Sequence, residues 1–145
     1  MKNRGHKIKF RGGKDANKML MRKLASNFLL HGKIETTKQK ARATQPMVEK
    51  LVTKAKRNTE ADRKFIAQHT TTQETAKILI RDIVVQLYKV NSGFKRIISL
   101  GVRQTDGAQK ARLEWAYPVV LTQEQKPKVK KSAVAKALAD KEENK

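Results

Sequence analysis

The residues best suited to chemistry in this sequence are lysines and arginines with a regular spacing. Lys14, Lys18 and Arg22 recur every four residues, so a helix would carry them along one ridge. Cationic side chains on such a ridge neutralise the phosphates of a nucleic acid and release its counterions. Lys is also more frequent than Arg in the chain, and it acts as a point charge for phosphates rather than as a fork for base edges. The spacing therefore predicts a ridge that follows a phosphate backbone.

Other kinds of chemistry find little support. His6, His31 and His69 are too far apart in the sequence to make a metal motif, and there is no Cys to supplement them. No Ser lies in a setting that would activate it, and no two acids form a convincing acid/base pair. Gly12-Gly13 lacks the lysine and the spacing of a phosphate-binding loop. The sequence thus predicts no catalytic residue, no metal, no cofactor and no small-molecule substrate, and the chain is not expected to be an enzyme.

The overall charge points to a polyanionic partner. The 145 residues include 34 Lys and Arg against 13 Asp and Glu, which gives a formal charge of +21. Most of this excess lies in the first 57 residues, as expected for a directed binding surface. Nucleic acid is the first candidate, and an anionic membrane surface is the second. We expect neither a transmembrane helix nor a signal peptide, because no apolar run is long enough and the N-terminus has no apolar core.

The ridge needs a helix to hold it. Asp15 is a suitable N-cap and Gly32 a suitable stop, so a helix is expected between them. Its apolar stripe is Ala16, Leu20, Leu24 and Phe28, widened by Met21, Ala25 and Leu29. We expect this stripe to pack on the core and the cations to face away from it.

A short strand and a second helix should follow. Residues 33–36 are too short to be a strand alone, but they can pair with a later hairpin. Thr37 is a suitable cap for a helix over 38–57. Pro46 falls inside that helix, where it removes a backbone hydrogen bond and crowds the preceding turn. We therefore predict a kink or break near residues 42–46.

The most apolar segment should form the central helix of the core. Thr59 caps a short helix that ends at about Gln68, and Thr71 with Glu74 matches a capping box. The next helix is expected over residues 72–90. Its inward stripe is Ala76, Leu79, Ile80, Ile83, Val84, Leu87 and Tyr88.

From Phe94 the apolar period changes from that of a helix to that of a strand. Two alternating runs flank Asp106-Gly107, which is a turn signal, and Pro118 closes the second run. The pattern predicts a hairpin with one buried face, in which Trp115 packs in the core.

The chain is expected to have three parts. Residues 1–13 form a basic arm that is disordered when free and that orders against RNA. Residues 14–118 form a single globular RNA-binding domain, and residues 119–145 form a Lys-rich extension.

Two blocks of the sequence resemble a known family. The first block is Arg22, Leu24-Ala25, His31, Ile34, Thr36-Thr37, Lys40-Ala41-Arg42, Glu49, Leu51-Val52-Thr53 and Ala55-Lys56. The second block is Arg96-Ile97-Ile98, Arg103, Asp106, Ala108, Ala111, Leu113 and Glu114. Together these blocks resemble the bacterial large-subunit ribosomal protein L-seventeen family. The chain departs from the family at Ala16-Asn17, where a His-Arg pair is usual, and at Ser92-Gly93, where two glycines are frequent.

The resemblance implies an α+β fold, with about four helices packed on a small three-stranded sheet. It also implies a structural protein that binds large-subunit ribosomal RNA near the polypeptide exit tunnel, beside other ribosomal proteins in the cytoplasm. The residues expected to contact RNA phosphates are Lys2, Arg4, Lys7, Lys9, Arg11, Lys14, Lys18, Arg22, Lys23, Lys38, Lys40, Arg42, Lys95, Arg96 and Arg103. Three alternatives are a DNA-compacting protein, an RNA-modifying enzyme and a membrane-surface binder.

Overall fold

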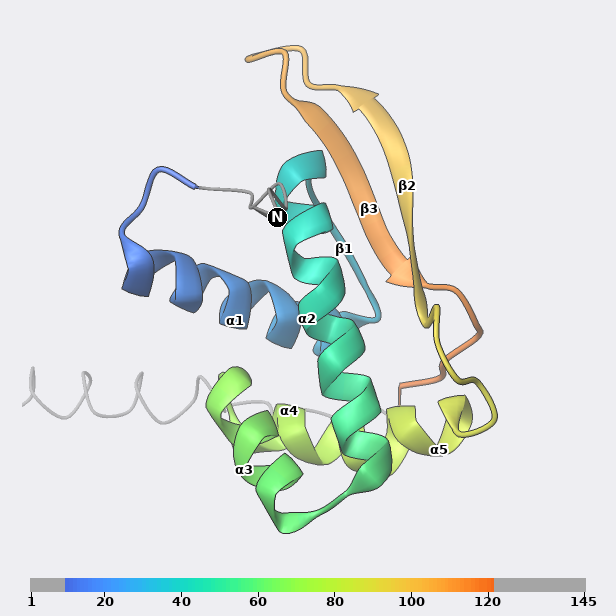
Figure 1. The fold of residues 1–145 in the computed structure, drawn as a ribbon. Helices are drawn as coiled ribbons and strands as arrows, with labels where there is room; N and C mark the ends of the chain where they lie inside the picture. Colours follow the sequence, from blue (N-terminus) through green and yellow to red (C-terminus); the bar gives the residue numbers. More distant parts are fainter. Residues whose placement is uncertain (1–9, 122–145) are drawn as a thin grey trace, which may run out of the picture.

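A computed structural model describes residues 10–121 (Figure 1). Helices pack on one side of a small antiparallel sheet, which confirms the predicted α+β class. The elements are α1 (Lys14–His31), β1 (Lys33–Thr37), α2 (Lys38–Arg57), α3 (Glu60–His69), α4 (Gln73–Ile78), the π-helical turn η1 (Leu79–Ile83), α5 (Val84–Leu87), β2 (Lys95–Val102) and β3 (Gln109–Trp115).

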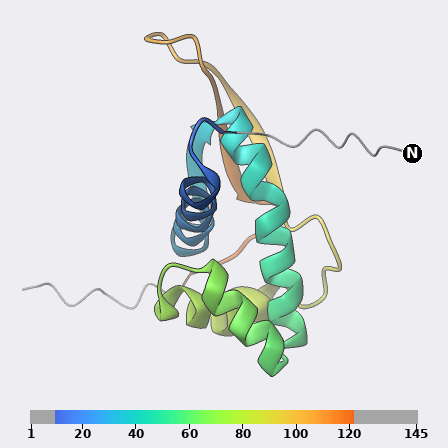
Figure 2. The same cartoon turned by 60° about the vertical axis from the view of Figure 1, so that its left-hand side comes forward.

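The sheet joins the N-terminal half of the chain to its C-terminal hairpin. Its order is β1-β3-β2, and both pairings are antiparallel. Leu113 of the central strand lies opposite Ile34 on one side and Ile97 on the other. The short strand expected at residues 33–36 therefore does pair with the hairpin. Helix α2 contacts all three strands, and Figure 2 shows α1 and α2 on the same side of the sheet.

The core lies between the helices and the inner face of the sheet. Phe28 of α1 is fully buried against Trp115 of β3, with ring centroids 4.5 Å apart. The largest fully buried side chains are Phe28, Phe94, Leu29, Leu51, Ile66, Leu79, Ile83, Leu87 and Leu113. The placement of Trp115 in the core confirms its predicted structural role.

Helix α1 is packed only along its C-terminal half. Ala25, Phe28 and Leu29 are buried, whereas Ala16 is exposed and Leu20 is only half-buried. The N-terminal half of α1 therefore projects from the body (Figure 1). The cap predicted at Asp15 is wrong, because Gly13 is the N-cap and Asp15 lies inside the first turn. An acid there still interacts favourably with the helix dipole.

Helix α2 runs without a break through Pro46, so the break predicted near residues 42–46 is wrong. Pro46 is exposed, while Ala41, Val48 and Leu51 pack in the core on both sides of it. Burial along the rest of the helix offsets the hydrogen bond that proline removes.

The predicted central helix contains a π-helical turn. The helical run extends from α4 through η1 to α5 and ends at Leu87, before the predicted end at residue 90. Val84 and Leu87 follow the π turn and are buried as predicted. Tyr88 lies beyond the end of α5 and is 72% exposed, so its predicted inward position is wrong.

The capping box predicted from Thr71 and Glu74 is also wrong. The N-cap of α4 is Thr72, whose hydroxyl accepts a hydrogen bond from the Thr75 backbone N–H. Thr71 instead donates its backbone N–H and its hydroxyl to Ser26 Oγ, at 2.8 and 3.0 Å. A tertiary contact to α1 has replaced the local cap.

The hairpin has one buried face, as predicted. Ala111, Leu113 and Trp115 are buried on β3, whereas Ile98 and Val102 on β2 are exposed. The pairing shifts between Ser99 and Gly101, so Leu100 is the extra residue of a bulge.

Candidate nucleic-acid interface

Helix α1 carries three exposed lysines, two of them on its projecting half. Lys14, Lys18 and Lys23 are exposed, and Arg11 is exposed in the segment just before the helix. None of them makes an ion pair with an acid within residues 10–121. These four predicted RNA-contacting residues are therefore exposed with their charge available, although Lys23 lies on the opposite face of α1 from Lys14.

Arg22 has a different environment from its neighbours. Its side chain is half-buried, and Nη2 donates a hydrogen bond of 2.7 Å to the Thr70 backbone oxygen. One helical turn after Arg22, Ser26 accepts the hydrogen bonds from Thr71. These contacts fasten α1 to the corner between α3 and α4. The predicted phosphate contact of Arg22 stays a prediction, and the structure adds a positioning role for it.

The start of α2 adds a second group of cations. Arg42 is exposed, while Lys38 and Lys40 are half-buried. The first turn of α2 contains no acid, and the N-cap Thr37 makes no side-chain capping hydrogen bond. A hollow of about 360 Å³ lies between this turn and the beginning of β3. Its lining residues are Thr37, Lys38, Gln39, Arg42, Ala108 and Gln109.

The sequence did not identify four of these lining residues, namely Thr37, Gln39, Ala108 and Gln109. The pairing of Thr37 with Lys110 brings the beginning of β3 beside the beginning of α2. The hydrophobic pattern predicted both strands but not their register. It therefore did not show which residues at the start of β3 lie beside Lys38. A register derived from the apolar pair Ile34 and Leu113 would have revealed them.

The predicted cations of the hairpin are already neutralised. Lys95 forms an ion pair with Glu49 and is nearly buried, and this burial lowers the pKa of its ammonium group. Arg96 pairs with Glu114 at 2.6 Å, and Arg103 pairs with Asp106 at 3.1 Å. Each of these three cations thus has an acid partner, namely Glu49, Glu114 or Asp106. The RNA contacts expected for Lys95, Arg96 and Arg103 stay a prediction, and these ion pairs argue against them.

The cations that pair with acids lie in a different part of the chain from those of α1. Arg112 holds Glu35 at 2.6 Å across the outer face of the sheet, and this hydrogen bond lowers the pKa of the Glu35 carboxyl group. Within residues 10–121, the cations that pair with acids are Lys54, Lys64, Arg81, Lys95, Arg96, Arg103 and Arg112. All of them lie beyond the first half of α2. Cations therefore remain available on α1, on β1 and at the start of α2.

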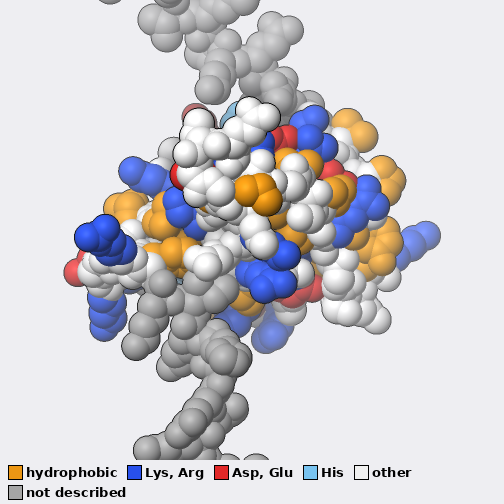
Figure 3. All heavy atoms as spheres, turned by 90° about the horizontal axis from the view of Figure 1, so that it is seen from above, with side chains coloured by type: hydrophobic (Ala, Val, Ile, Leu, Met, Phe, Trp, Pro, Cys, Tyr) orange, Lys and Arg blue, Asp and Glu red, His pale blue; other side chains and the backbone are white. Residues whose placement is uncertain are grey.

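A view from above shows how this division looks on one face of the molecule. In Figure 3, Lys and Arg side chains form several groups around the edge of the face, with fewer Asp and Glu side chains among them. The surface is not uniformly basic, because apolar and neutral atoms separate these groups.

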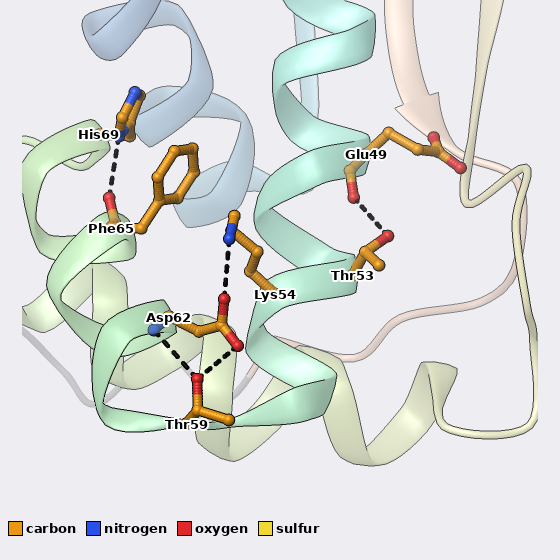
Figure 4. A network of polar contacts seen from close by, with 7 residues as sticks. All are labelled: Glu49, Thr53, Lys54, Thr59, Asp62, Phe65 and His69. Atoms are coloured by element: carbon orange, nitrogen blue, oxygen red, sulfur yellow. Dashed lines mark hydrogen bonds and ion pairs between the residues drawn. The ribbon is translucent and has the colours of Figure 1, made fainter.

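The polar network between α2 and α3 is structural (Figure 4). Lys54 Nζ lies 2.8 Å from Asp62 Oδ1 and 4.6 Å from the centre of the Phe65 ring, and His69 stacks on the same ring. Hydrogen bonds from Lys54 and from the Thr59 hydroxyl lower the pKa of the Asp62 carboxyl group. The network joins two helices and leaves no open position for a substrate.

Two other kinds of site are absent from the part of the chain that the structure describes. Residues 10–121 contain no cluster of three or more His, Asp or Glu with the arrangement of a metal site. They also contain no helix that is long and apolar enough to cross a membrane. The predicted arm residues Lys2, Arg4, Lys7 and Lys9 lie outside the described residues, as does most of the expected extension at 119–145.

Comparison with known proteins decides the family. A sequence model described as "Ribosomal protein L17" matches residues 20–116. The chain belongs to the ribosomal protein L17 family. One relative is the "Large ribosomal subunit protein bL17" of Clostridium perfringens (strain SM101 / Type A), which is 37% identical over 100 residues, or 69% of this chain and 88% of the relative. The protein of the same name from Clostridium botulinum (strain Hall) is 36% identical over the same shares of both chains.

Membership in this family confirms the resemblance seen in the two sequence blocks. A ribosomal protein of the L17 family is a structural component of the ribosome and not an enzyme, as predicted from the absence of a catalytic constellation. The cytoplasmic location expected for the chain is confirmed on the same ground. The RNA-modifying enzyme is thereby set aside as an alternative.

Proposed function

We propose that this ribosomal protein stabilises the large subunit by binding its ribosomal RNA through phosphate neutralisation. The observation that supports the proposal is the separation of charge in the fold. Acids pair with cations on α3, the α4–α5 run and the hairpin, and the cations of α1 and early α2 have no acid partner within residues 10–121. Phosphates are the partners that complete this surface.

The mechanism follows from the kind of cation and from its support. The exposed Lys14, Lys18 and Lys23 act as point charges toward phosphates, without reading base edges. The packed half of α1 holds them in place through Phe28 and Ser26. The protein then works as a wedge that holds together RNA segments whose phosphates repel one another.

The place of this wedge in the subunit is part of the proposal. The family resemblance supports a position near the polypeptide exit tunnel, with neighbouring ribosomal proteins as further partners. The relatives from both Clostridium species are named as large-subunit proteins, which supports the same assembly. The basic arm at residues 1–13 would extend the contact along the RNA.

The salt dependence of RNA binding tests the proposal. For the full chain and a large-subunit RNA fragment, log Kobs should fall linearly with log salt concentration, by roughly 0.7–0.9 per neutralised phosphate. Replacing Lys14, Lys18 and Lys23 together by Gln should reduce the slope by about two units. The matched control replaces three paired cations, Lys64, Arg96 and Arg103, and should change it far less.

Two results would contradict the proposal. A flat salt response of the unaltered protein would show that phosphate neutralisation is not the source of affinity. Equal affinity for duplex DNA under the same conditions would favour the DNA-compacting alternative. Sedimentation of a cell lysate provides an independent test, because the protein should migrate with the large subunit after a high-salt wash.

A further inference from the structure

The hollow between α2 and β3 combines two cations that have no acid partner within residues 10–121 with neutral hydrogen-bonding side chains. It measures about 360 Å³ and lies where the start of α2 approaches the start of β3. Lys38 and Arg42 line it on the α2 side, one helical turn apart, and Gln109 and Ala108 line it on the hairpin side. The walls thus come from two segments that are far apart in the sequence and are joined by the sheet.

The hollow keeps its positive charge. Neither Lys38 nor Arg42 makes an ion pair with any acid in residues 10–121. The acid of the adjacent turn is Asp106, whose Oδ2 is held by Arg103 at 3.1 Å and whose Oδ1 accepts the Ala108 backbone N–H at 3.2 Å. Internal contacts therefore occupy that carboxylate, and it does not neutralise the two cations.

The uncharged lining supplies hydrogen bonds of both kinds. The amides of Gln39 and Gln109 can each donate and accept, and the Thr37 hydroxyl can do the same. A phosphate alone would need only the cations, while a sugar hydroxyl or a base edge would need groups of this second kind. The volume also exceeds that of a site for a bare phosphate, since hollows of this size hold small organic molecules.

We propose that this hollow seats one nucleotide of an unpaired RNA segment. Its phosphate lies between the Lys38 ammonium group and the Arg42 guanidinium group, and its sugar or base lies against the amides of Gln39 and Gln109. The inference rests on the proposed RNA-binding function and assigns to it a discrete site. Another hollow in the described residues, of about 400 Å³, includes Glu49, which already pairs with its Lys95.

A substitution that fills the hollow without changing its charge tests the site directly. Ala108→Leu places a larger apolar side chain in the hollow and leaves Lys38 and Arg42 unchanged. The full chain with this substitution should bind a short single-stranded RNA about tenfold more weakly than the unaltered protein, because charge-assisted hydrogen bonds are lost. Its affinity for a blunt RNA duplex should not change, because a paired nucleotide cannot enter the hollow.

A double-substitution cycle tests whether the two cations hold the same phosphate. Lys38→Gln and Arg42→Gln should each weaken single-strand binding, and the double variant should lose less than the product of the two separate losses. Lys77→Gln is the matched control, since Lys77 is exposed on α4 and has no acid partner within residues 10–121. Circular dichroism of each variant establishes that the fold is retained.

The possible outcomes separate this inference from the proposed function. If Ala108→Leu binds the single strand as well as the unaltered protein does, or if the two losses multiply, the hollow is not a nucleotide site, although RNA binding stands. If Ala108→Leu weakens binding to the duplex and to the single strand equally, the hollow is again not selective for an unpaired nucleotide. If the unaltered protein binds neither RNA, the proposed function itself fails.

Discussion

Arg22 provides the sharpest test of which cations hold the fold and which remain for RNA. Its Nη2 donates to the Thr70 backbone oxygen at 2.7 Å, and its Nε is buried without a partner within residues 10–121. Replacing it by Gln removes a charged donor and leaves the Thr70 carbonyl oxygen without this bond. We therefore expect Arg22→Gln to destabilise the protein by releasing α1 from the corner between α3 and α4.

The size of the effect follows from the geometry of this bond. A hydrogen bond to a charged group contributes about 1.5–3 kcal/mol, and its acceptor here is a half-buried backbone oxygen. A loss of about 2 kcal/mol in the free energy of unfolding, divided by a urea dependence of about 2 kcal/mol per M, lowers the urea midpoint by about 1 M. Urea unfolding followed by circular dichroism measures this shift.

Lys23→Gln is the matched control, since it removes the same charge from the next position. Lys23 is exposed and makes no ion pair with an acid within residues 10–121. The free energy of unfolding of Lys23→Gln should therefore stay within about 0.5 kcal/mol of that of the unaltered protein. Its effect should appear in the salt slope of RNA binding. The reasoning is refuted if Arg22→Gln unfolds at the original midpoint and loses salt slope in the same way as Lys23→Gln.

Three further predictions concern the core, the acid network and the hairpin. Phe28→Ala should lower the unfolding free energy by about 3–5 kcal/mol in urea titrations, because Phe28 is fully buried against Trp115; a loss below 1 kcal/mol would contradict this packing. The Asp62 carboxyl has a lowered pKa in the folded state, so its stabilisation is present above the unfolded pKa near 3.8 and is lost as pH falls below it; Asp62→Asn should reduce that acid dependence of the midpoint, and an unchanged profile would argue against the network. Arg96→Gln should leave the salt slope of RNA binding nearly unchanged, since Glu114 already holds Arg96, and a loss of about one unit would restore the hairpin to the interface.

Most of the fold was predictable because its elements have strong local signals. Residues 38–57 follow a helical stripe, the capped helix after Thr59 ends where expected, and the change to a period of two at Phe94 marks the hairpin. The buried alternation of Ala111, Leu113 and Trp115 also follows from the strand period. These features depend on residues close together in the sequence, which is the information that a pattern contains.

The errors come from contacts between distant segments. Thr71 binds Ser26 of α1 instead of capping α4, because a buried hydroxyl on α1 needs a partner. Pro46 lies in an unbroken helix, since packing on both sides outweighs a local penalty. In each position a tertiary contact overrides the local preference.

The same limit applies to the candidate site. Charge type and spacing identified Lys14, Lys18 and Lys23 as exposed cations, and the structure agrees with that exposure. They did not distinguish Lys23 from Arg22, because burial depends on the packing of α1. They also did not identify Arg96 as paired, because its partner Glu114 is set by the register of β2 with β3. Net charge predicts the kind of partner, and register determines which cations are free for it.

Antiparallel pairing and helix packing together explain why the charge is divided along the chain. The sheet places Glu114 beside Arg96 and Glu35 beside Arg112, so these two arginines are neutralised within the fold. Helix α1 and the first turns of α2 have few acids of their own, and their cations repel one another in the free protein. A bound polyanion relieves this repulsion only in the folded state, because only the fold holds these cations in fixed positions. RNA that binds the folded chain as proposed should therefore also stabilise the fold, since a ligand that prefers the folded state shifts the folding equilibrium toward it.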